Sequence, residues 1–347
     1  MNYTTTGLAT ALTIVLILLK STSFANDLYV TQVGDDLTLT VTQDGENNSV
    51  RSMALTSGSA TVSGDDKTLT FSQTGDNNKI GTWSSGHDQT ITITSTGNAN
   101  TAKVDNHGDR NTQTVTQTGN NHVAHVEIGN GGDNDNTQTV AQYGDSQYAY
   151  VEANGDSNVM TTWQGGNADS SFIRTMTTGD SNNINLRQGK KLDGTVDNND
   201  SGNFEQYITI SGNNNDVDTS QVNSGGAGSD HHMAHVITGN NNVLSHLQYA
   251  DKKKLGFIEI TGDDNSVTLE QRNSSNHFAD IVLTGDDHTV FGSQRGGANA
   301  HNFSVDLTNG GGAYNLSTTQ NSNTAQTYNL TGSCTNALGC GIVVNQN

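Results

Sequence analysis

Short segments in which apolar and polar residues alternate recur along the whole chain. Residues 37–42 read Leu-Thr-Leu-Thr-Val-Thr, and residues 90–94 read Thr-Ile-Thr-Ile-Thr. A period of two is typical of a β-strand with one buried and one solvent-facing side. The intervening segments Gly-Asp-Asp-Asn, Gly-Asn-Asn-Asn and Gly-Asp-Ser-Asn hold residues that tolerate positive φ or bond to their own backbone. The pattern therefore predicts many short strands joined by tight turns.

One repeat emerges when the chain is aligned on its turn glycines. These are Gly45, Gly75, Gly97, Gly119, Gly144, Gly179, Gly212, Gly239, Gly262 and Gly285. Relative to the glycine, an apolar residue falls at −4, Asn at +3, Val, Ile or Ala at +5, and Gln at +9. Such self-similarity at a fixed period is the mark of a repeat architecture.

The amide columns of the repeat are its most regular feature. The Asn column holds Asn48, Asn78, Asn100, Asn158, Asn182, Asn215, Asn242 and Asn265. The Gln column at +9 holds Gln164, Gln188, Gln221, Gln248, Gln271 and Gln294, and a second column at −2 holds Gln43, Gln73, Gln117 and Gln142. Stacked amides can donate to the copy below and accept from the copy above, so we expect amide ladders.

The glycine spacing sets the length of one coil. Gly75, Gly97 and Gly119 are equally spaced, and Gly239, Gly262 and Gly285 repeat nearly the same interval. Gly108 falls midway between Gly97 and Gly119, so the elementary unit is about 11 residues, one strand and one turn. Units of this kind bury their apolar side by stacking at ~4.8 Å. We predict an all-β, amyloid-like β-solenoid of stacked strand-turn-strand repeats, with about 22–23 residues per coil.

The N-terminus is typical of an export signal. An apolar stretch from Leu8 to Leu19 is followed by Ser23-Phe24-Ala25, with small residues at the cleavage-determining positions. The stretch is short for a membrane span, and no Lys or Arg precedes it, which leaves an uncleaved anchor as the alternative. The predicted organisation is a signal peptide (1–25), an N-terminal segment (26–36), solenoid repeats (37–327) and a C-terminal coil (328–347). No membrane span is expected after cleavage.

Composition and charge narrow the class of protein further. The chain has 39 glycines, no proline and 31% hydrophobic residues. Proline would delete a ladder donor from any strand, and its absence excludes collagen and proline-rich linkers. The hydrophobic content is low for conventional cores and sufficient for a solenoid two strands thick. The formal charge of −20 argues against nucleic acid or anionic lipid as a main partner.

The column set Q-x-G-x-x-N-x-[VAI]-x-x-x-Q resembles the curlin repeat of bacterial curli amyloid subunits. The segment Gln73-Thr74-Gly75-Asp76-Asn77-Asn78-Lys79-Ile80 matches its first half, and Asn265-Ser266-Val267-Thr268-Leu269-Glu270-Gln271 matches its second half. The resemblance covers most of residues 37–320. The chain departs from the family in its many coils, in the insertions at 190–201 and 224–230, and in a C-terminal cysteine pair.

This resemblance implies a structural function. It implies a secreted subunit that leaves through a curli-type outer-membrane pore and assembles into extracellular amyloid fibres for biofilm matrix and cell adhesion. The expected partners are further copies of the chain or another curlin-like subunit, with host or matrix ligands also conceivable. Major, minor or nucleating subunit all remain open. The alternative is a monomeric secreted adhesin whose exposed solenoid surface binds glycan or host protein.

Other chemistries have weaker signals. His231 and His235 share one side of a strand, so a metal pair is conceivable, but no fixed partner ligand stands out and we predict no metal site and no cofactor. The Asp-rich turns at Gly262 and Gly285 lack the calcium nonapeptide of β-rolls, and turn chemistry explains their carboxylates.

Catalysis and ice binding also rank low on the sequence. We find no Ser/His/Asp set or paired carboxylates outside the periodic positions, so the chain is predicted not to be an enzyme. The Thr-x-Thr tracts suggest an ice-binding surface, which needs a flat, unbroken Thr array. Along the sequence the outer positions mix Thr with Glu, Asp, His and Arg, which disfavours it.

The two cysteines, Cys334 and Cys340, lie near the C-terminus. In an exported protein a disulfide is the default interpretation, and here it would close one small loop.

Overall fold

The structure is a computed structural model, and it describes most of the chain. The described residues are 4–5, 13–18, 26–28, 30–33, 37–51, 60–63, 65–128, 133–165, 170–192, 194–196, 203–223, 230–273, 275–296, 299–307, 312–332 and 339–346. These residues contain only strands and turns, and so no helix that could cross a membrane. They divide into two compact units, Met1–Thr162 and Trp163–Asn347, called unit 1 and unit 2 below.

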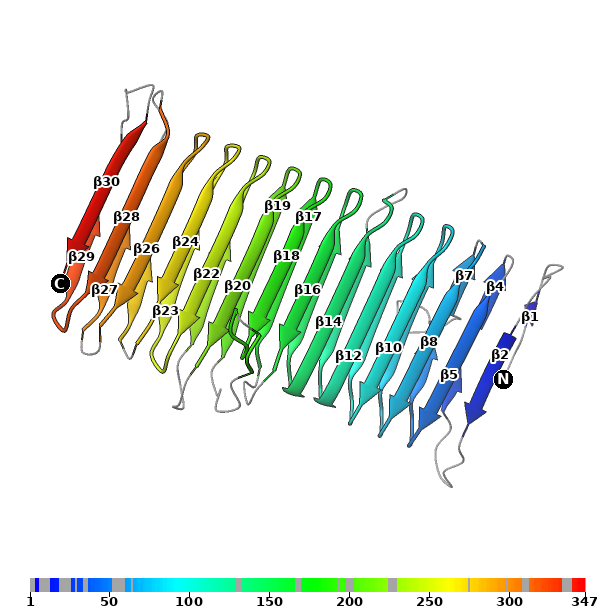
Figure 1. The fold of residues 1–347 in the computed structure, drawn as a ribbon. Helices are drawn as coiled ribbons and strands as arrows, with labels where there is room; N and C mark the ends of the chain where they lie inside the picture. Colours follow the sequence, from blue (N-terminus) through cyan, green and yellow to red (C-terminus); the bar gives the residue numbers. More distant parts are fainter. Residues whose placement is uncertain are drawn as a thin grey trace. The chain divides into compact units, whose positions relative to one another are not determined.

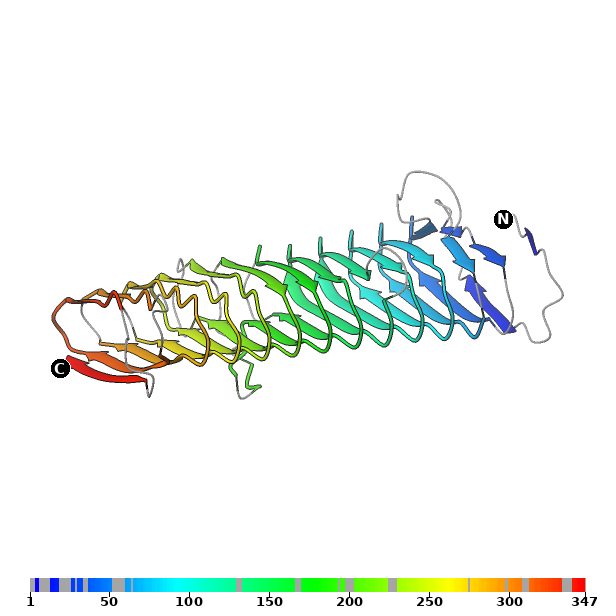
Figure 2. The same ribbon diagram turned by 90° about the horizontal axis from the view of Figure 1, so that it is seen from above.

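Each unit is a β-solenoid made of two sheets of parallel strands, sheet A and sheet B, and the chain alternates between them (Figures 1 and 2). In unit 1, sheet A contains β1 (Thr4–Thr5), β3 (Asp27–Leu28), β4 (Val30–Val33), β6 (Ser49–Arg51), β7 (Ala60–Ser63), β9 (Lys79–Ser84), β11 (Thr101–Asn106), β13 (Val123–Ile128) and β15 (Tyr148–Ala153). Sheet B contains β2 (Thr13–Leu18), β5 (Thr38–Asp44), β8 (Thr68–Thr74), β10 (Thr90–Thr96), β12 (Thr112–Asn120) and β14 (Thr137–Asp145). The strand β16 (Val159–Gln164) contains the boundary between the units.

Unit 2 repeats the same plan. Its sheet A contains β17 (Phe172–Thr178), β19 (Phe204–Ser211), β21 (His231–His235), β23 (Lys254–Ile258), β25 (His277–Ala279), β27 (His301–Ser304) and β29 (Gln326–Asn329). Its sheet B contains β18 (Asn183–Gln188), β20 (Asp216–Val222), β22 (Val243–Tyr249), β24 (Ser266–Gln271), β26 (Thr289–Arg295), β28 (Tyr314–Asn321) and β30 (Cys340–Gln346). The predicted all-β solenoid class is therefore confirmed.

The coil length varies more than the sequence repeat predicts. Leu69 pairs with Ile91 across one of the shortest coils, whereas Leu39 pairs with Leu69 and Leu186 pairs with Thr219 across much longer ones. The predicted coil length therefore holds only for the shortest coils. The strands keep an in-register parallel pairing in spite of the extra residues.

Alternation along each strand builds the core between the sheets. In β10 the residues Ile91 and Ile93 are fully buried, while the alternating Thr90, Thr92 and Thr94 lie on the solvent side. The same alternation in β13 buries Ala124, Val126 and Ile128. Because one coil is only two strands thick, the core is a single narrow layer that repeats at each coil.

The N-terminal segment that resembles an export signal partly forms a strand in the full chain. β2 pairs in parallel with β5, with Leu18 opposite Gln43. Cleavage after Ala25 stays a prediction, and Ala25 itself lies outside the described residues. Removal of residues 1–25 would take away β2 and leave β5 as the edge strand of sheet B.

Candidate functional site

The buried glutamines of sheet B form a row of side-chain hydrogen bonds in unit 2. Nε2 of each glutamine donates to Oε1 of the glutamine in the next coil, at 2.9 to 3.1 Å. The members are Gln164, Gln188, Gln221, Gln248, Gln271, Gln294, Gln320 and Gln346. The alignment missed Gln320 and Gln346 because the set of aligned turn glycines ends at Gly285.

A shorter version of this row lies in sheet B of unit 1. Gln43 donates to Gln73 at 2.9 Å and Gln117 to Gln142 at 3.0 Å. Between these pairs the position is occupied by Ser95, whose hydroxyl donates to Gln117 Oε1 at 3.0 Å. The two Gln columns of the sequence are thus both sheet B columns. They differ in offset because one is counted from glycines that follow the sheet B strand and the other from glycines that precede it.

Each of these glutamines also links the two sheets. Gln117 Nε2 donates to the carbonyl of Thr101 at 3.0 Å, and Gln248 Nε2 donates to the carbonyl of His232 at 3.0 Å. One buried amide therefore satisfies a partner in the next coil and a partner in the opposite sheet. A buried hydrogen bond contributes about 1 kcal/mol net, and bonds in such a chain polarise one another.

The Asn column divides into three ladders at two kinds of turn. Asn48, Asn78 and Asn100 lie where the chain passes from sheet B to sheet A in unit 1. Asn158 lies at the opposite turn, in a ladder with Asn111 and Asn136 that the alignment missed. In unit 2, Asn182, Asn215, Asn242 and Asn265 also occupy the turns from sheet A to sheet B. The signal that could have found Asn111 is its +3 position after Gly108.

The Asn side chains bind mainly to backbone rather than to one another. Asn78 Oδ1 accepts the backbone N–H of Asn100 at 3.0 Å, and Asn78 Nδ2 donates to the carbonyl of Gly97 at 2.7 Å. Only in unit 2 is an amide-to-amide bond a regular addition, for example from Asn242 to Asn215 at 3.0 Å. Each Asn thus satisfies the turn of the neighbouring coil, which fixes the stacking register.

The aligned glycines occupy two separate stacks. Those from Gly45 to Gly144 lie at the turns from sheet B to sheet A in unit 1, and those from Gly179 to Gly285 lie at the turns from sheet A to sheet B in unit 2. Gly97 has φ 109°, and a Cβ on it would lie 2.0 Å from the carbonyl oxygen of Gly119. Only glycine fits, because the turn needs positive φ and the next coil touches it directly.

The acidic turn residues form an outer ladder. Asp263 Oδ1 accepts the backbone N–H of Asn240 at 2.6 Å, and Asp286 Oδ1 accepts the backbone N–H of Asp263 at 2.8 Å. These carboxylates therefore serve as turn-stacking acceptors. Within the described ranges, no three His, Cys, Asp or Glu side chains come together as a metal-binding group.

Unit 2 carries mostly basic side chains at a buried position that unit 1 fills mostly with amides. We call this the A-start position. In most coils, one sheet A residue accepts a hydrogen bond from a sheet B glutamine through its carbonyl, and the A-start residue is the one directly before it in the chain. In unit 1 it holds Asn48, Asn100 and His122 among others, and in unit 2 it holds, among others, Phe204, His231, Lys254, His277 and His301. All of these side chains are buried.

Burial controls the ionisation of the A-start residues. Desolvation of the charged form lowers the pKa of His231 and His277 to about 3 and that of Lys254 to about 7. Lys254 Nζ donates to the carbonyls of Asn273 at 2.9 Å and Ser275 at 2.5 Å. His277 acts like an asparagine, since its Nδ1 accepts the backbone N–H of His301 at 3.4 Å while its Nε2 donates to the carbonyl of Arg272 at 2.8 Å. These partners require the neutral ring.

The structure brings His231 and His235 to the same side of β21 without bringing them together. His231 stacks on Phe204 with ring centroids 5.3 Å apart. His235 Nε2 lies 3.0 Å from Nδ1 of His246 on the opposite sheet, and burial lowers the pKa of both rings. His231 and His235 are thus packed core residues of unit 2.

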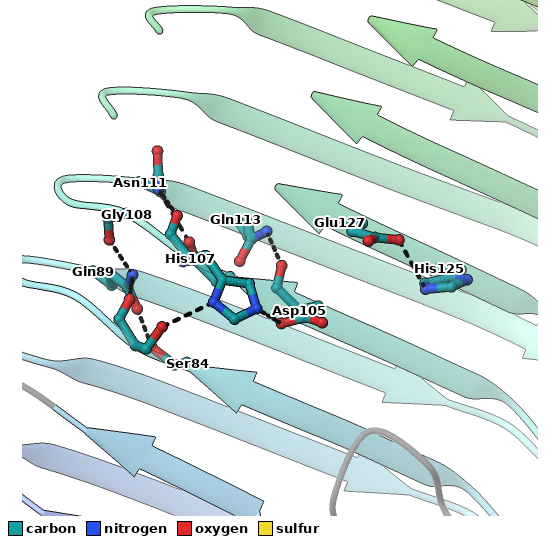
Figure 3. Close-up of polar contacts among 11 residues, drawn as sticks. Ser84, Gln89, Asp105, His107, Gly108, Asn111, Gln113, His125 and Glu127 are labelled. Atoms are coloured by element: carbon teal, nitrogen blue, oxygen red, sulfur yellow. Dashed lines mark hydrogen bonds and ion pairs between the residues drawn. The ribbon is translucent and has the colours of Figure 1, made fainter. Parts of the chain in front are cut away.

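A Ser-His-Asp cluster that sequence reasoning missed lies at one turn of unit 1, and Figure 3 labels its His107 and Asp105. Ser85 Oγ is 3.0 Å from His107 Nδ1, and His107 Nε2 is 3.1 Å from Asp105 Oδ1. The last contact is poorly aligned, since Asp105 Oδ1 has no hydrogen-bond partner among the described residues. A catalytic triad needs the acid to hold the ring by a directed hydrogen bond, so we assign no catalysis to this cluster. Desolvation raises the pKa of Asp105. The expectation that the chain is not an enzyme stays a prediction.

The C-terminal cysteines are only partly described. Cys340 opens β30 and is disulfide-bonded. Cys334 lies outside the described residues. The bonded Cys340 ties down the start of the last described strand of sheet B.

The two ends of the glutamine rows are chemically complementary. Gln43 Oε1 is buried and has no hydrogen-bond partner in the described part of the chain. Its register partner in β2 is Leu18, which carries no amide. At the other end, Gln346 Nε2 donates to the carbonyl of Thr327 at 3.3 Å, and no further described glutamine follows it. One end therefore offers an acceptor and the other a donor.

No family model matches the chain, and no curated protein matches it.

Proposed function

We propose that the chain is a structural subunit of an extracellular, curli-like amyloid fibre that supports biofilm matrix and cell adhesion. The observation that carries the proposal is the complementarity of the two glutamine-row ends. Within each unit, a coil is held to the next by parallel strand pairing, amide rows and stacked turns. A second copy can continue all three interactions if its first coil docks on the last coil of the copy before it.

The donor and acceptor directions support a head-to-tail order. In the inner coils a glutamine Nε2 donates both to a sheet A carbonyl and to the next glutamine, as Gln320 does to Asn302 and Gln346. Gln346 makes only the first of these bonds. In the proposed contact, its second N–H donates to Gln43 Oε1 of the next copy, as an inner glutamine donates to the glutamine of the next coil. Unpaired strand edges add backbone hydrogen bonds to this contact.

Predicted signal cleavage would prepare the first coil for docking. Loss of residues 1–25 removes β2, which pairs with β5 in the full chain. Export and exposure of the assembling edge would then be one event. The charge of −20 keeps separate subunits apart, so we expect added salt to speed their association by screening.

The test is seeded polymerisation of the secreted form, followed by thioflavin fluorescence. Gln346→Leu removes the donor of the last rung, and we expect slower elongation from wild-type seeds. Asn345→Leu, an exposed change on the same strand, is the matched control and should elongate at the wild-type rate. A wild-type protein that never polymerises, yet binds a glycan or protein ligand saturably, would reject the fibre and favour the adhesin. Equal rates for both variants would reject the glutamine contact.

A further inference from the structure

The solvent side of sheet B in unit 1 carries a two-dimensional array of threonines. Five consecutive strands, β5, β8, β10, β12 and β14, pair in parallel and in register. Two columns hold threonine in every one of these strands. They are Thr38, Thr68, Thr90, Thr112 and Thr137, and Thr40, Thr70, Thr92, Thr114 and Thr139.

Two flanking columns extend the array. The next column holds Thr42, Ser72, Thr94, Thr116 and Ala141, and the last holds Asp44, Thr74, Thr96, Thr118 and Tyr143. Asp44 is the one Asp, Glu, Lys, Arg or His among these positions. A chain with a net charge of −20 thus presents a nearly uncharged surface here.

Along the sequence, charged residues interrupt the threonine tracts, but in the structure these residues lie on other surfaces than the array. The outer side of sheet A carries Lys103, His125 and Glu127. The outer side of sheet B in unit 2 carries Arg187 and Asp218. Read along the chain these residues alternate with the Thr tracts, whereas in space they belong to other surfaces. The unbroken threonine array that an ice-binding surface needs is therefore present on sheet B of unit 1.

The array is also rigid and regularly spaced. Neighbouring threonines are separated by ~4.8 Å across the strands and by roughly 6.7 Å, the rise of two residues, along a strand. Fully buried Leu69, Ile91 and Val115 pack beneath it, and the amide row fixes the register of the strands. Threonine has few side-chain rotamers because it branches at Cβ. The side chains of the two all-threonine columns are accessible to water in the described strands.

We propose that this threonine array is an ice-binding surface. Ice presents a planar, uncharged lattice of oxygen atoms with repeats close to the two spacings of the array. Hydroxyls can join that lattice by donating and accepting, while the methyl groups occupy the spaces between. Because the array is held rigid before binding, little conformational entropy is lost when ordered water freezes onto it. The charge-free character of the surface complements an uncharged crystal face.

Ice binding does not depend on fibre assembly. The array lies on the broad surface of sheet B, whereas the proposed subunit contacts lie at the edges of the sheets. Monomers and fibres therefore both present it. Failure of one proposal leaves the other standing.

The test measures thermal hysteresis, and the fraction of protein taken up by a slowly grown ice crystal, for the freshly purified full chain. Thr92→Tyr places a bulky ring at the centre of the array and keeps a strand-forming residue. We expect it to abolish most of the hysteresis and the uptake. Thr268→Tyr is the matched control, since Thr268 faces solvent on sheet B of unit 2 between Ser245 and Phe291. It should behave as wild type.

A second variant separates lost binding from lost folding. Thr92→Val with Thr114→Val removes two hydroxyls and keeps the volume, and unfolding monitored by circular dichroism checks that the fold persists. We expect reduced hysteresis with an unchanged spectrum. Wild-type protein without hysteresis or ice uptake would overturn the proposal. So would folded Thr92→Tyr protein with wild-type activity.

Discussion

The two units stack their coils in the same way but with different side chains at the A-start position. At the A-start position, unit 1 uses mainly asparagine, whose amide accepts from one coil and donates to another at any pH. Unit 2 places His231, Lys254, His277 and His301 at this position. A neutral imidazole can imitate an amide, but it loses its acceptor when protonated. The same solenoid geometry can therefore be built from side chains that titrate, which make its stability sensitive to acid, or from amides, which do not.

The largest effect that the comparison predicts is acid lability of unit 2. Its described residues include the buried histidines His231, His235, His246, His277, His288 and His301, and burial lowers the pKa of each. A lowered native pKa means that stability is full above the unfolded value of 6.5 and is lost as the pH falls toward the native value, about 3 for His277. Each fully buried ring lowers the free energy of unfolding by up to about 1.4 kcal/mol per pH unit.

The measurement is hydrogen exchange of peptides from each unit between pH 7 and pH 4, corrected for intrinsic rates. Peptides from unit 2 should lose protection first. Unit 1, in which His122 is the one described histidine with a fully buried side chain, serves as the internal control. Parallel loss of protection in both units would break the comparison.

A second prediction concerns what the units share. Gly97→Ala in unit 1 and Gly239→Ala in unit 2 should each destabilise by about 3 kcal/mol or more. The reason is common to both, because each new Cβ would lie 2.0 to 2.2 Å from the carbonyl oxygen of the next turn. Gly341→Ala, with no atom within 4 Å of the added Cβ, is the control and should be neutral. Urea unfolding provides the measurement, and a stable Gly97→Ala protein would contradict the stacked-turn geometry.

Exchanging side chains between the units gives a sharper third test. His277→Asn should remove part of the pH dependence of unit 2, by up to about 1.4 kcal/mol per pH unit, since an amide does not titrate. Asn78→His should create the same dependence in unit 1, because Asn78 is fully buried and holds the equivalent position. Urea midpoints measured at several pH values decide the matter. Unchanged pH profiles in both variants would show that these positions do not set the acid response.

The smallest expected effect comes from a substitution that completes the glutamine row of unit 1. Ser95 interrupts that row, whereas the row of unit 2 is continuous. Ser95→Gln should add bonds to Gln73 and Gln117 and stabilise by about 1 kcal/mol. Replacing Gln221 of unit 2 with Ser should cost a similar amount. A destabilised Ser95→Gln protein, seen by thermal unfolding, would mean that the space beside Ser95 differs from that of the other coils.

Much of this architecture follows from local sequence. Strand alternation, turn chemistry and the amide columns are all short-range features, and they predict a β-solenoid and the residues that stack. Local sequence does not say which of the two turns a repeat occupies. Both turns use the same Gly-x-x-Asn chemistry, so the shift between the Gly45–Gly144 set and the Gly179–Gly285 set is invisible until the strands are paired.

Contacts between neighbouring coils were harder to predict, because the residues that meet lie a whole coil apart in the chain. Lys254 and His277 stack one coil apart, at a position for which the aligned repeat has no shared residue type. The Ser85, His107 and Asp105 cluster likewise joins two coils. The threonine array was hidden for the same reason, since its neighbours in space lie a whole coil apart in sequence and the coils differ in length.

The most direct test of the central claim is X-ray fibre diffraction from the secreted protein after incubation and seeding. Stacked coils joined end to end predict fibres with a reflection at ~4.8 Å along the fibre axis and one at ~10 Å across it. Protein that remains monomeric, with no fibres and neither reflection, would contradict the account.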